Sequence, residues 1–135
     1  MKFIPRAKPW ILSASVTLVS ALLTQDLAAR ECDLAYAKRI YTKCALCHSL
    51  EAGHHMMGPS LYNIVGAKAG SAEGYRYSAP MRNSDIVWSE TKLDRFIESP
   101  MQFLPGTSMP FAGIRNEADR AALLCLLSNT NKAEE

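Results

Sequence analysis

The chain has 135 residues and a nearly balanced charge, with 15 Lys and Arg against 13 Asp and Glu and a formal net charge of +2. Lys2, Arg6 and Lys8 account for three of the basic residues and Asp26 for one of the acidic ones, so residues 30–135 carry 12 of each sign. This balance argues against a nucleic-acid-binding protein, which needs a basic surface.

The first 29 residues have the layout of a secretory signal peptide. Their basic start is followed by the uncharged run Trp10–Leu23 and then by the small residues Ala28 and Ala29. The run is short for a membrane span, which needs about 20 apolar residues. We therefore expect cleavage after Ala29, with an uncleaved amino-terminal anchor as the alternative. Residues 30–135 then form a single domain, since about 106 residues are too few for two.

Three segments of this domain predict helices. Residues 33–42 carry apolar side chains at helical spacing behind an acidic N-cap. A second helix is predicted from the cap residue Ser89 to just before Pro100. A third begins at Asn116, has acidic residues in its first turn and carries a stripe of leucines.

The segment between the first two helices is punctuated by glycine. Glycines recur from Gly53 to Gly74, which predicts a loop with room for one short helical turn near residues 61–65. A second short turn is allowed at residues 78–85, and Pro105 followed by glycine predicts a turn after the second helix. Strand patterns are nearly absent. Three helices joined by long loops give a small apolar core, so we expect another group to fill the centre.

The run Cys-Ala-Leu-Cys-His, from Cys44 to His48, has the spacing by which c-type haem is attached. Two thiols three positions apart can each add to one vinyl group of a porphyrin, and the next histidine then lies beneath the iron. We therefore expect one haem bound covalently through Cys44 and Cys47, with His48 as an axial ligand. A zinc site in which His54 and His55 join the two cysteines is the alternative.

The rest of the chain resembles the class I cytochromes c. The segment Leu104–Ile114, with the sequence LPGTSMPFAGI, looks like the loop that carries the methionine ligand of that family, and the resemblance spans residues 33 to about 129. It implies an all-α fold, the class I cytochrome c fold, with three main helices and long loops wrapped around one haem. It also implies that Met109 is the iron ligand opposite His48.

The resemblance implies roles for further residues around the haem. The backbone carbonyl of Pro59 would accept a hydrogen bond from the His48 ring and fix its tautomer. Tyr77 and Trp88 match a pair that hydrogen-bonds a buried haem propionate, and Thr107 matches a hydroxyl that reaches the other propionate. The apolar side chains expected to wall the ring are Leu61, Phe111 and Leu127.

The chain departs from the family pattern at several positions. Ala67 replaces an arginine that lies near a propionate in many relatives, with Lys68 as a substitute. Phe96 replaces a tyrosine whose hydroxyl touches the methionine sulfur in many relatives, and Met81 replaces an asparagine of the buried polar network. Both changes predict drier, more apolar surroundings on the methionine side. Ser108 replaces a lysine on the docking rim, so we expect a weaker basic patch. The basic residues that remain for it are Lys43, Arg115, Arg76 and Arg82.

The resemblance implies an electron carrier and not an enzyme. With His48 and Met109 both bound, the iron has no open site for oxygen or peroxide, and a thioether ligand raises the potential. We expect a soluble, periplasmic monomer that carries electrons between a quinol-oxidising complex and a terminal oxidase or dehydrogenase chain. The alternatives are a haem enzyme or ligand-binding haem protein with an open sixth site, and a metal-binding or thiol-redox module without haem.

Cys32 and Cys125 lie outside the haem motif, and spare thiols of an exported protein usually pair. The first and last helices cross in the class I fold, and the resemblance extends to a similar pair of cysteines in bacterial relatives. We therefore expect a disulfide between Cys32 and Cys125. The alternative is a small core residue at Cys125 and a free thiol at Cys32.

Overall fold

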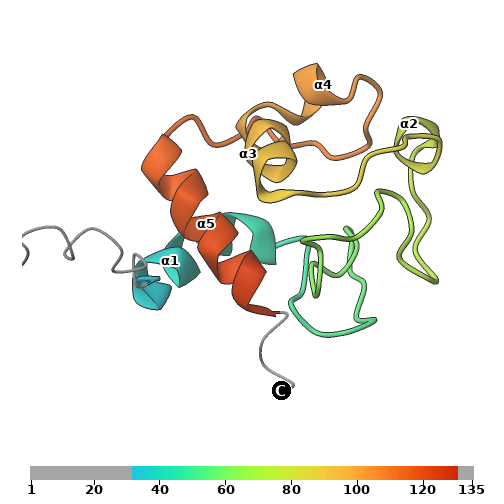
Figure 1. The fold of residues 1–135 in the computed structure, drawn as a ribbon. Coiled ribbons are helices and arrows are strands. Elements are labelled where there is room, and N and C mark those ends of the chain that lie inside the picture. Colours follow the sequence, from blue (N-terminus) through green and yellow to red (C-terminus); the bar gives the residue numbers. More distant parts are fainter. Residues whose placement is uncertain (1–31, 131–135) are drawn as a thin grey trace, which may run out of the picture. The chain divides into compact units, whose positions relative to one another are not determined.

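The computed structural model describes residues 32–130 (Figure 1), so the predicted signal peptide at residues 1–29 lies outside the described residues. No helix among the described residues is long and apolar enough to cross a bilayer. Within them, the only strand-like pairing is an isolated antiparallel bridge between Lys68 and Val87. The described helices, in chain order, are α1 Leu34–Ala45, α2 Ala79–Arg82, α3 Glu90–Glu98, α4 Pro100–Phe103 and α5 Glu117–Asn129.

The three predicted main helices begin where their capping residues predict. The Asp33 carboxylate accepts a hydrogen bond from the Tyr36 backbone N–H at 2.9 Å, at the start of α1. Ser89 accepts in the same way from the third residue of α3, and Asn116 from the third residue of α5. Each cap satisfies a backbone donor that has no partner inside its helix.

Two helical boundaries differ from the prediction. Helix α1 continues past Thr42 to Ala45 because nothing in that stretch breaks a helix. Helix α4 was not predicted, and it follows α3 after the single residue Ser99. Pro100 ends α3 as expected, but its fixed φ also suits the first turn of the next helix, where a missing N–H does no harm.

Helix α5 joins the other helices into one core. It packs against α1 and α3, and Figure 1 shows α5 crossing α1. The fully buried Ala37 of α1 permits a close approach. On the other side, the buried guanidinium of Arg120 pairs with Asp94 of α3 at 2.7 Å and donates to the Ile114 carbonyl at 3.1 Å. The prediction of an all-α domain is therefore confirmed within the described residues.

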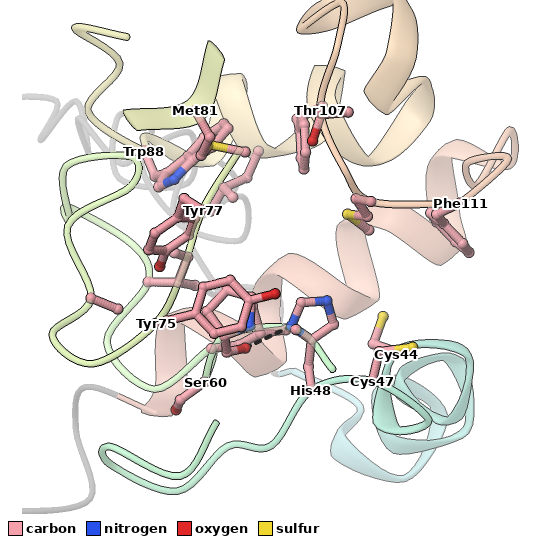
Figure 2. Close-up of a pocket in the computed structure, with 18 of the residues that line it drawn as sticks. Cys44, Cys47, His48, Ser60, Tyr75, Tyr77, Met81, Trp88, Thr107 and Phe111 are labelled. Atoms are coloured by element: carbon pink, nitrogen blue, oxygen red, sulfur yellow. Dashed lines mark hydrogen bonds between the residues drawn. The ribbon is translucent and has the colours of Figure 1, made fainter. Parts of the chain in front are cut away.

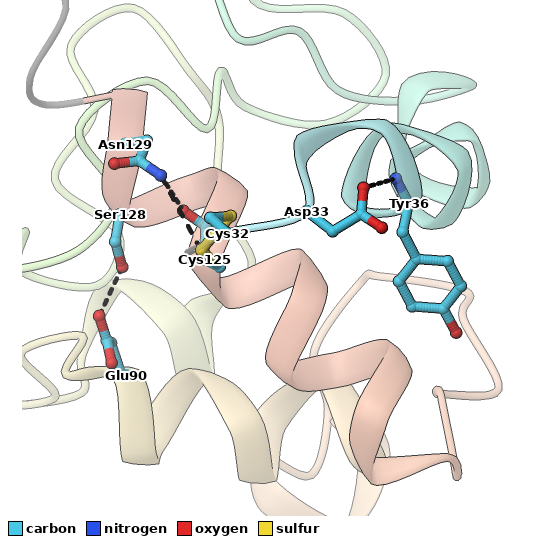
Figure 3. Close-up of a disulfide and its surroundings, with 7 residues drawn as sticks. All are labelled: Cys32, Asp33, Tyr36, Glu90, Cys125, Ser128 and Asn129. Atoms are coloured by element: carbon cyan, nitrogen blue, oxygen red, sulfur yellow. Dashed lines mark hydrogen bonds between the residues drawn. A yellow bond between two sulfur atoms is a disulfide. The ribbon is translucent and has the colours of Figure 1, made fainter. Parts of the chain in front are cut away.

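A disulfide joins the start of α1 to the middle of α5. Cys32 and Cys125 are bonded through their sulfur atoms, and their Cα atoms are 6.0 Å apart (Figure 3). Because the two cysteines are 93 positions apart, this bond closes a loop that spans almost the whole described chain.

The long loop between α1 and α2 is held by side chains and not by regular structure. The His55 ring accepts a hydrogen bond from the Ser60 N–H at 3.0 Å and donates to the Glu73 carbonyl at 2.8 Å. The Tyr75 hydroxyl donates to the Met57 carbonyl at 2.6 Å. These bonds connect the two halves of the loop and so shape the space that it encloses.

Candidate functional site

A cavity of about 700 Å³ lies between the helices and the long loops. Its volume falls in the range of cofactor and small-molecule sites. The residues predicted to attach, ligate or hydrogen-bond the haem all line this one cavity, although they span most of the described chain. They are Cys44, Cys47, His48, Pro59, Tyr77, Trp88, Thr107 and Met109.

The end of α1 brings the two thiols and the histidine together. The N–H groups of Cys47 and His48 both donate to the Cys44 carbonyl at 2.9 Å, which closes the chain tightly after the helix. Neither cysteine takes part in a disulfide, and Figure 2 shows both beside His48 at the same wall of the cavity.

The His48 ring is held in one orientation and one tautomer. Its Nδ1 lies 2.6 Å from the Pro59 carbonyl oxygen, which only accepts, so Nδ1 carries the proton and Nε2 keeps a free lone pair. Burial lowers the pKa of His48, while the bond to Pro59 acts in the opposite direction. A neutral imidazole with a free Nε2 is the form that binds a metal.

Gly58 provides the space that this ring orientation requires. A Cβ atom on Gly58 would lie only 2.3 Å from Cε1 of His48 and 2.6 Å from its Nδ1. The Gly58 N–H also donates to the Cys47 carbonyl at 2.8 Å, which draws this loop against the thiols. The backbone thus packs flat against the imidazole.

The loop after α4 carries Met109 to the same cavity. A turn places Gly106 at φ +83°, and the Thr107 N–H donates to the Leu104 carbonyl at 3.1 Å. The Phe111 N–H then donates to the Met109 carbonyl at 2.9 Å, which tightens the backbone around the methionine. Thr107 is buried, and Met109 packs against the hydrophobic core.

The remaining wall is mostly apolar, and the departures from the family pattern form part of it. Met81 and Phe96 are both buried and both line the cavity, as do Ala67 and Lys68. The predicted wall residues Leu61, Phe111 and Leu127 also line it. Met81 and Phe96 thus make their part of the cavity wall apolar.

Ser78 is a cavity residue that the sequence did not single out. Its hydroxyl is buried, lines the cavity and has no hydrogen-bond partner within the described part of the chain. Ser78 stands at the N-cap position of α2, but its side chain makes no capping bond. A buried polar atom left unpaired is unfavourable, so this hydroxyl is suited to a polar atom of a bound group. Its position next to Tyr77, a predicted haem contact, is the feature of the sequence that could have indicated its role.

The zinc alternative has no support among residues 32–130. His54 pairs with the Glu51 carboxylate at 2.9 Å, and His55 is used in the loop contacts described above. Neither histidine lines the cavity, and no three His, Cys, Asp or Glu side chains in this range are grouped as metal ligands.

The residues of the cavity fit a covalently attached haem. Two free thiols and a neutral imidazole lie at one wall, a thioether is carried by another loop, and apolar side chains surround the space between. The unpaired Ser78 hydroxyl and the Tyr77 phenol supply polar partners of the kind that a propionate needs.

Comparison with known proteins gives the same assignment. Residues 34–131 match the family model for cytochrome c. A cytochrome c2 from Rhodomicrobium vannielii is 35% identical over 115 residues, which cover 84% of this chain and 92% of that protein. A cytochrome c from Theileria parva is 42% identical over 96 residues, or 70% of this chain and 83% of that protein. The structure of cytochrome cH from Methylobacterium extorquens has a TM-score of 0.68 and 32% identity, covering 72% of this chain and 98% of that one.

Proposed function

The chain belongs to the cytochrome c family, as a class I c-type cytochrome, and on that premise we propose that it carries single electrons on a haem ligated by His48 and Met109. As a member of this family it has one covalently bound haem c. The observation that supports this ligation best is the convergence of Cys44, Cys47, His48 and Met109 on one cavity.

Each of these residues has a distinct part in the proposal. Cys44 and Cys47 would hold the porphyrin through thioether bonds, and His48 would bind the iron through Nε2, which the Pro59 carbonyl leaves free. When bound, the haem supplies reversible one-electron chemistry between ferrous and ferric iron. The protein's task is then to hold a rigid, dry site that changes little when the charge changes.

The role of Met109 distinguishes an electron carrier from a ligand-binding haem protein, because it determines whether the sixth position of the iron is filled. A thioether in the sixth position leaves no open site for oxygen or peroxide and favours the ferrous state. The buried side chains of Met81 and Phe96 make the cavity wall apolar, which helps to exclude water. We therefore favour electron transfer over an enzyme or a ligand sensor.

We also propose a cellular location and redox partners for the protein. The pattern of residues 1–29 supports export and removal of a signal peptide, with residues 30–135 as the mature cytochrome domain. This favours a periplasmic, soluble monomer that receives electrons from a quinol-oxidising complex and passes them to an oxidase or a dehydrogenase chain.

Two measurements on protein matured with a haem-attachment system test the proposal. Mass spectrometry should find one added haem that stays attached after denaturation. Met109→Ala should keep that haem, lower its potential and allow it to bind carbon monoxide. Met101→Ala, which removes an exposed methionine of α4 that does not line the cavity, should change none of these properties. Unchanged ligand binding in Met109→Ala would show that another residue fills the sixth position.

A further inference from the structure

Arg120 is a charged residue whose guanidinium lies inside the protein, where it joins three parts of the chain. The residue is 6% exposed and stands on α5. Its Nε and Nη2 donate to the two carboxylate oxygens of Asp94 on α3, at 2.7 and 3.3 Å. Its Nη1 donates to the backbone carbonyls of Ile114 and Arg115, at 3.1 and 3.0 Å. These two residues end the segment that Figure 1 shows running from α4 past α3 to α5.

The bonds to the two carbonyls go beyond what an ion pair between helices requires. The planar guanidinium carries N–H groups along more than one edge, so it can hold a carboxylate on one side and carbonyls on another. Hydrogen bonds from a charged donor are stronger than those between neutral groups. Because the bond to the Ile114 carbonyl is also buried, no water is available to replace it. Arg120 therefore fixes the end of this segment as well as the packing of α3 against α5.

The segment from Met109 to Ile114 has little freedom to absorb a shift of its end. The Phe111 N–H donates to the Met109 carbonyl at 2.9 Å, which closes a tight turn directly after the methionine. Gly113 has φ +96°, and a Cβ atom there would lie 2.0 Å from the Glu98 carbonyl oxygen, so the backbone packs directly on the end of α3. A displacement of Ile114 would therefore also displace Met109.

We propose that Arg120 is a positioning residue for the iron ligand, because its bonds to the Ile114 and Arg115 carbonyls keep the Met109 thioether in the cavity. This inference rests on the proposed function, in which Met109 fills the sixth position of the iron. Arg120 does not line the cavity, so it restrains the ligand without adding a charge to the apolar wall. A restrained ligand keeps the site rigid, as the proposed electron transfer requires.

Carbon monoxide binding to the reduced, haem-loaded protein tests the proposal, because the gas reaches the iron only after Met109 has left it. Arg120→Met removes every donor, so the Ile114 and Arg115 carbonyls must move to find new partners. We expect carbon monoxide to bind at least about tenfold faster than in the native protein, since charge-assisted bonds are lost. The sulfur-to-iron absorption band of the oxidised protein should weaken as well. An unchanged rate would overturn the proposal.

Asp94→Asn is the matched control. It removes the ion pair with α3 but leaves Arg120 bonded to both loop carbonyls. It should lower the free energy of unfolding, yet change the carbon monoxide rate by less than about threefold, since the carbonyl bonds remain. The double variant Cys32→Ala and Cys125→Ala serves as a second control, because it loses stability without altering this segment. Equal acceleration in Arg120→Met and either control would show that Arg120 acts only through general stability, and the idea would be wrong.

Failure of the proposed ligation would look different from failure of this inference. Met109→Ala gives the carbon monoxide rate for an open sixth position. A native protein as fast as Met109→Ala would show that Met109 is not the ligand, and both proposals would fall. A slow native protein with an equally slow Arg120→Met variant would overturn the role of Arg120 alone.

Discussion

At the scale of single residues, the site depends on a contact between Gly58 and the His48 ring. Gly58→Ala would place a methyl group 2.3 Å from Cε1 of His48, far inside normal contact distance. The ring must move and lose its 2.6 Å bond to the Pro59 carbonyl. We expect a loss of about 1–3 kcal/mol in the free energy of unfolding and a changed absorption spectrum of the haem.

Gly53→Ala is the control for this prediction. Gly53 has φ +67° and no atom within 4 Å of the added methyl group. Its substitution strains the backbone by about 1 kcal/mol, but the added methyl group does not contact the His48 ring. Stability should therefore fall in both variants, whereas the haem spectrum should change only in Gly58→Ala. Native spectra in both would contradict the role given to Gly58.

The individual cavity residues differ in how far the sequence predicts them. Cys44, Cys47 and His48 are local in sequence, so their spacing alone predicts the chemistry. Met109 required the resemblance of the whole segment around it, because a lone methionine in a loop carries no pattern of its own. Ser78 was missed because its importance lies in an absent hydrogen bond, which only the packed structure reveals.

At the scale of elements, the side chain of His55 holds separate segments of the loop between α1 and α2 together. Its ring links the Ser60 N–H to the Glu73 carbonyl and lies 5.5 Å from the Tyr75 ring. His55→Ala removes two hydrogen bonds between otherwise separate segments. We expect it to lower the free energy of unfolding by about 2 kcal/mol, as two such bonds contribute together.

The neighbouring histidine is a matched control. The His54 side chain is 57% exposed and contacts only the exposed carboxylate of Glu51 among the interactions seen for its ring. Such surface pairs contribute about 0–1 kcal/mol, so His54→Ala should be nearly neutral in chemical denaturation. Equal losses in the two alanine variants would show that His55 does not hold the loop.

The link between α1 and α5 gives a second prediction at this scale. The Cys32–Cys125 bond restrains the unfolded chain over 93 positions, for which loop-closure entropy gives an upper limit of about 4–5 kcal/mol. We expect the double variant Cys32→Ala and Cys125→Ala to lose about 2–4 kcal/mol in guanidinium denaturation.

Reduction provides the control for the disulfide. With the iron kept ferrous in every sample, a thiol reductant should destabilise the native protein by about the same amount and should leave the double variant unaffected. Two titratable thiols in the unfolded, unreduced native protein would instead show that the bond does not form.

The starts of the three main helices were predicted correctly from their capping residues, whereas the end of α1 was not. Asp33, Ser89 and Asn116 act locally, so their capping role can be recognised in the sequence. Helix α4 could not be predicted in this way, because Pro100 is compatible both with the end of one helix and with the start of another. The short helical turn that the sequence allowed near residues 61–65 does not form, since the Leu61 and Gly66 N–H groups donate to carbonyls of distant residues.

At the scale of the whole molecule, the cofactor cavity and the hydrophobic core are continuous. Leu93, Phe96 and Leu127 belong to the core cluster and also line the cavity. One face of these side chains therefore packs on other helices, while the other face is left for the haem. The haem therefore completes a hydrophobic core that three helices and long loops would leave small. The sequence predicts such a group from the small number of apolar residues in the helices.

Tyrosine burial links the stability of the whole fold to alkaline pH. Burial raises the pKa of Tyr41, and burial also raises the pKa of Tyr77. The neutral phenol is therefore favoured in the folded protein. Below pH 10, the ordinary value for tyrosine, the phenol is neutral in both states and its full contribution is present. Above that pH the unfolded chain loses its proton more readily, so stability falls as the pH rises through the folded pKa.

A single substitution isolates this effect. The Tyr41 hydroxyl donates to the His48 carbonyl at 2.7 Å, so Tyr41→Phe should lower the free energy of unfolding by about 1 kcal/mol at pH 8. Guanidinium denaturation of both proteins, repeated at increasing pH, gives the difference between them. We expect this difference to stay constant up to about pH 10 and to shrink above it, because only the native chain has a Tyr41 phenol to ionise. Other alkaline changes act on both proteins and cancel in the comparison. A difference that remained constant through pH 11 would mean that Tyr41 ionises equally well in the folded and unfolded chains.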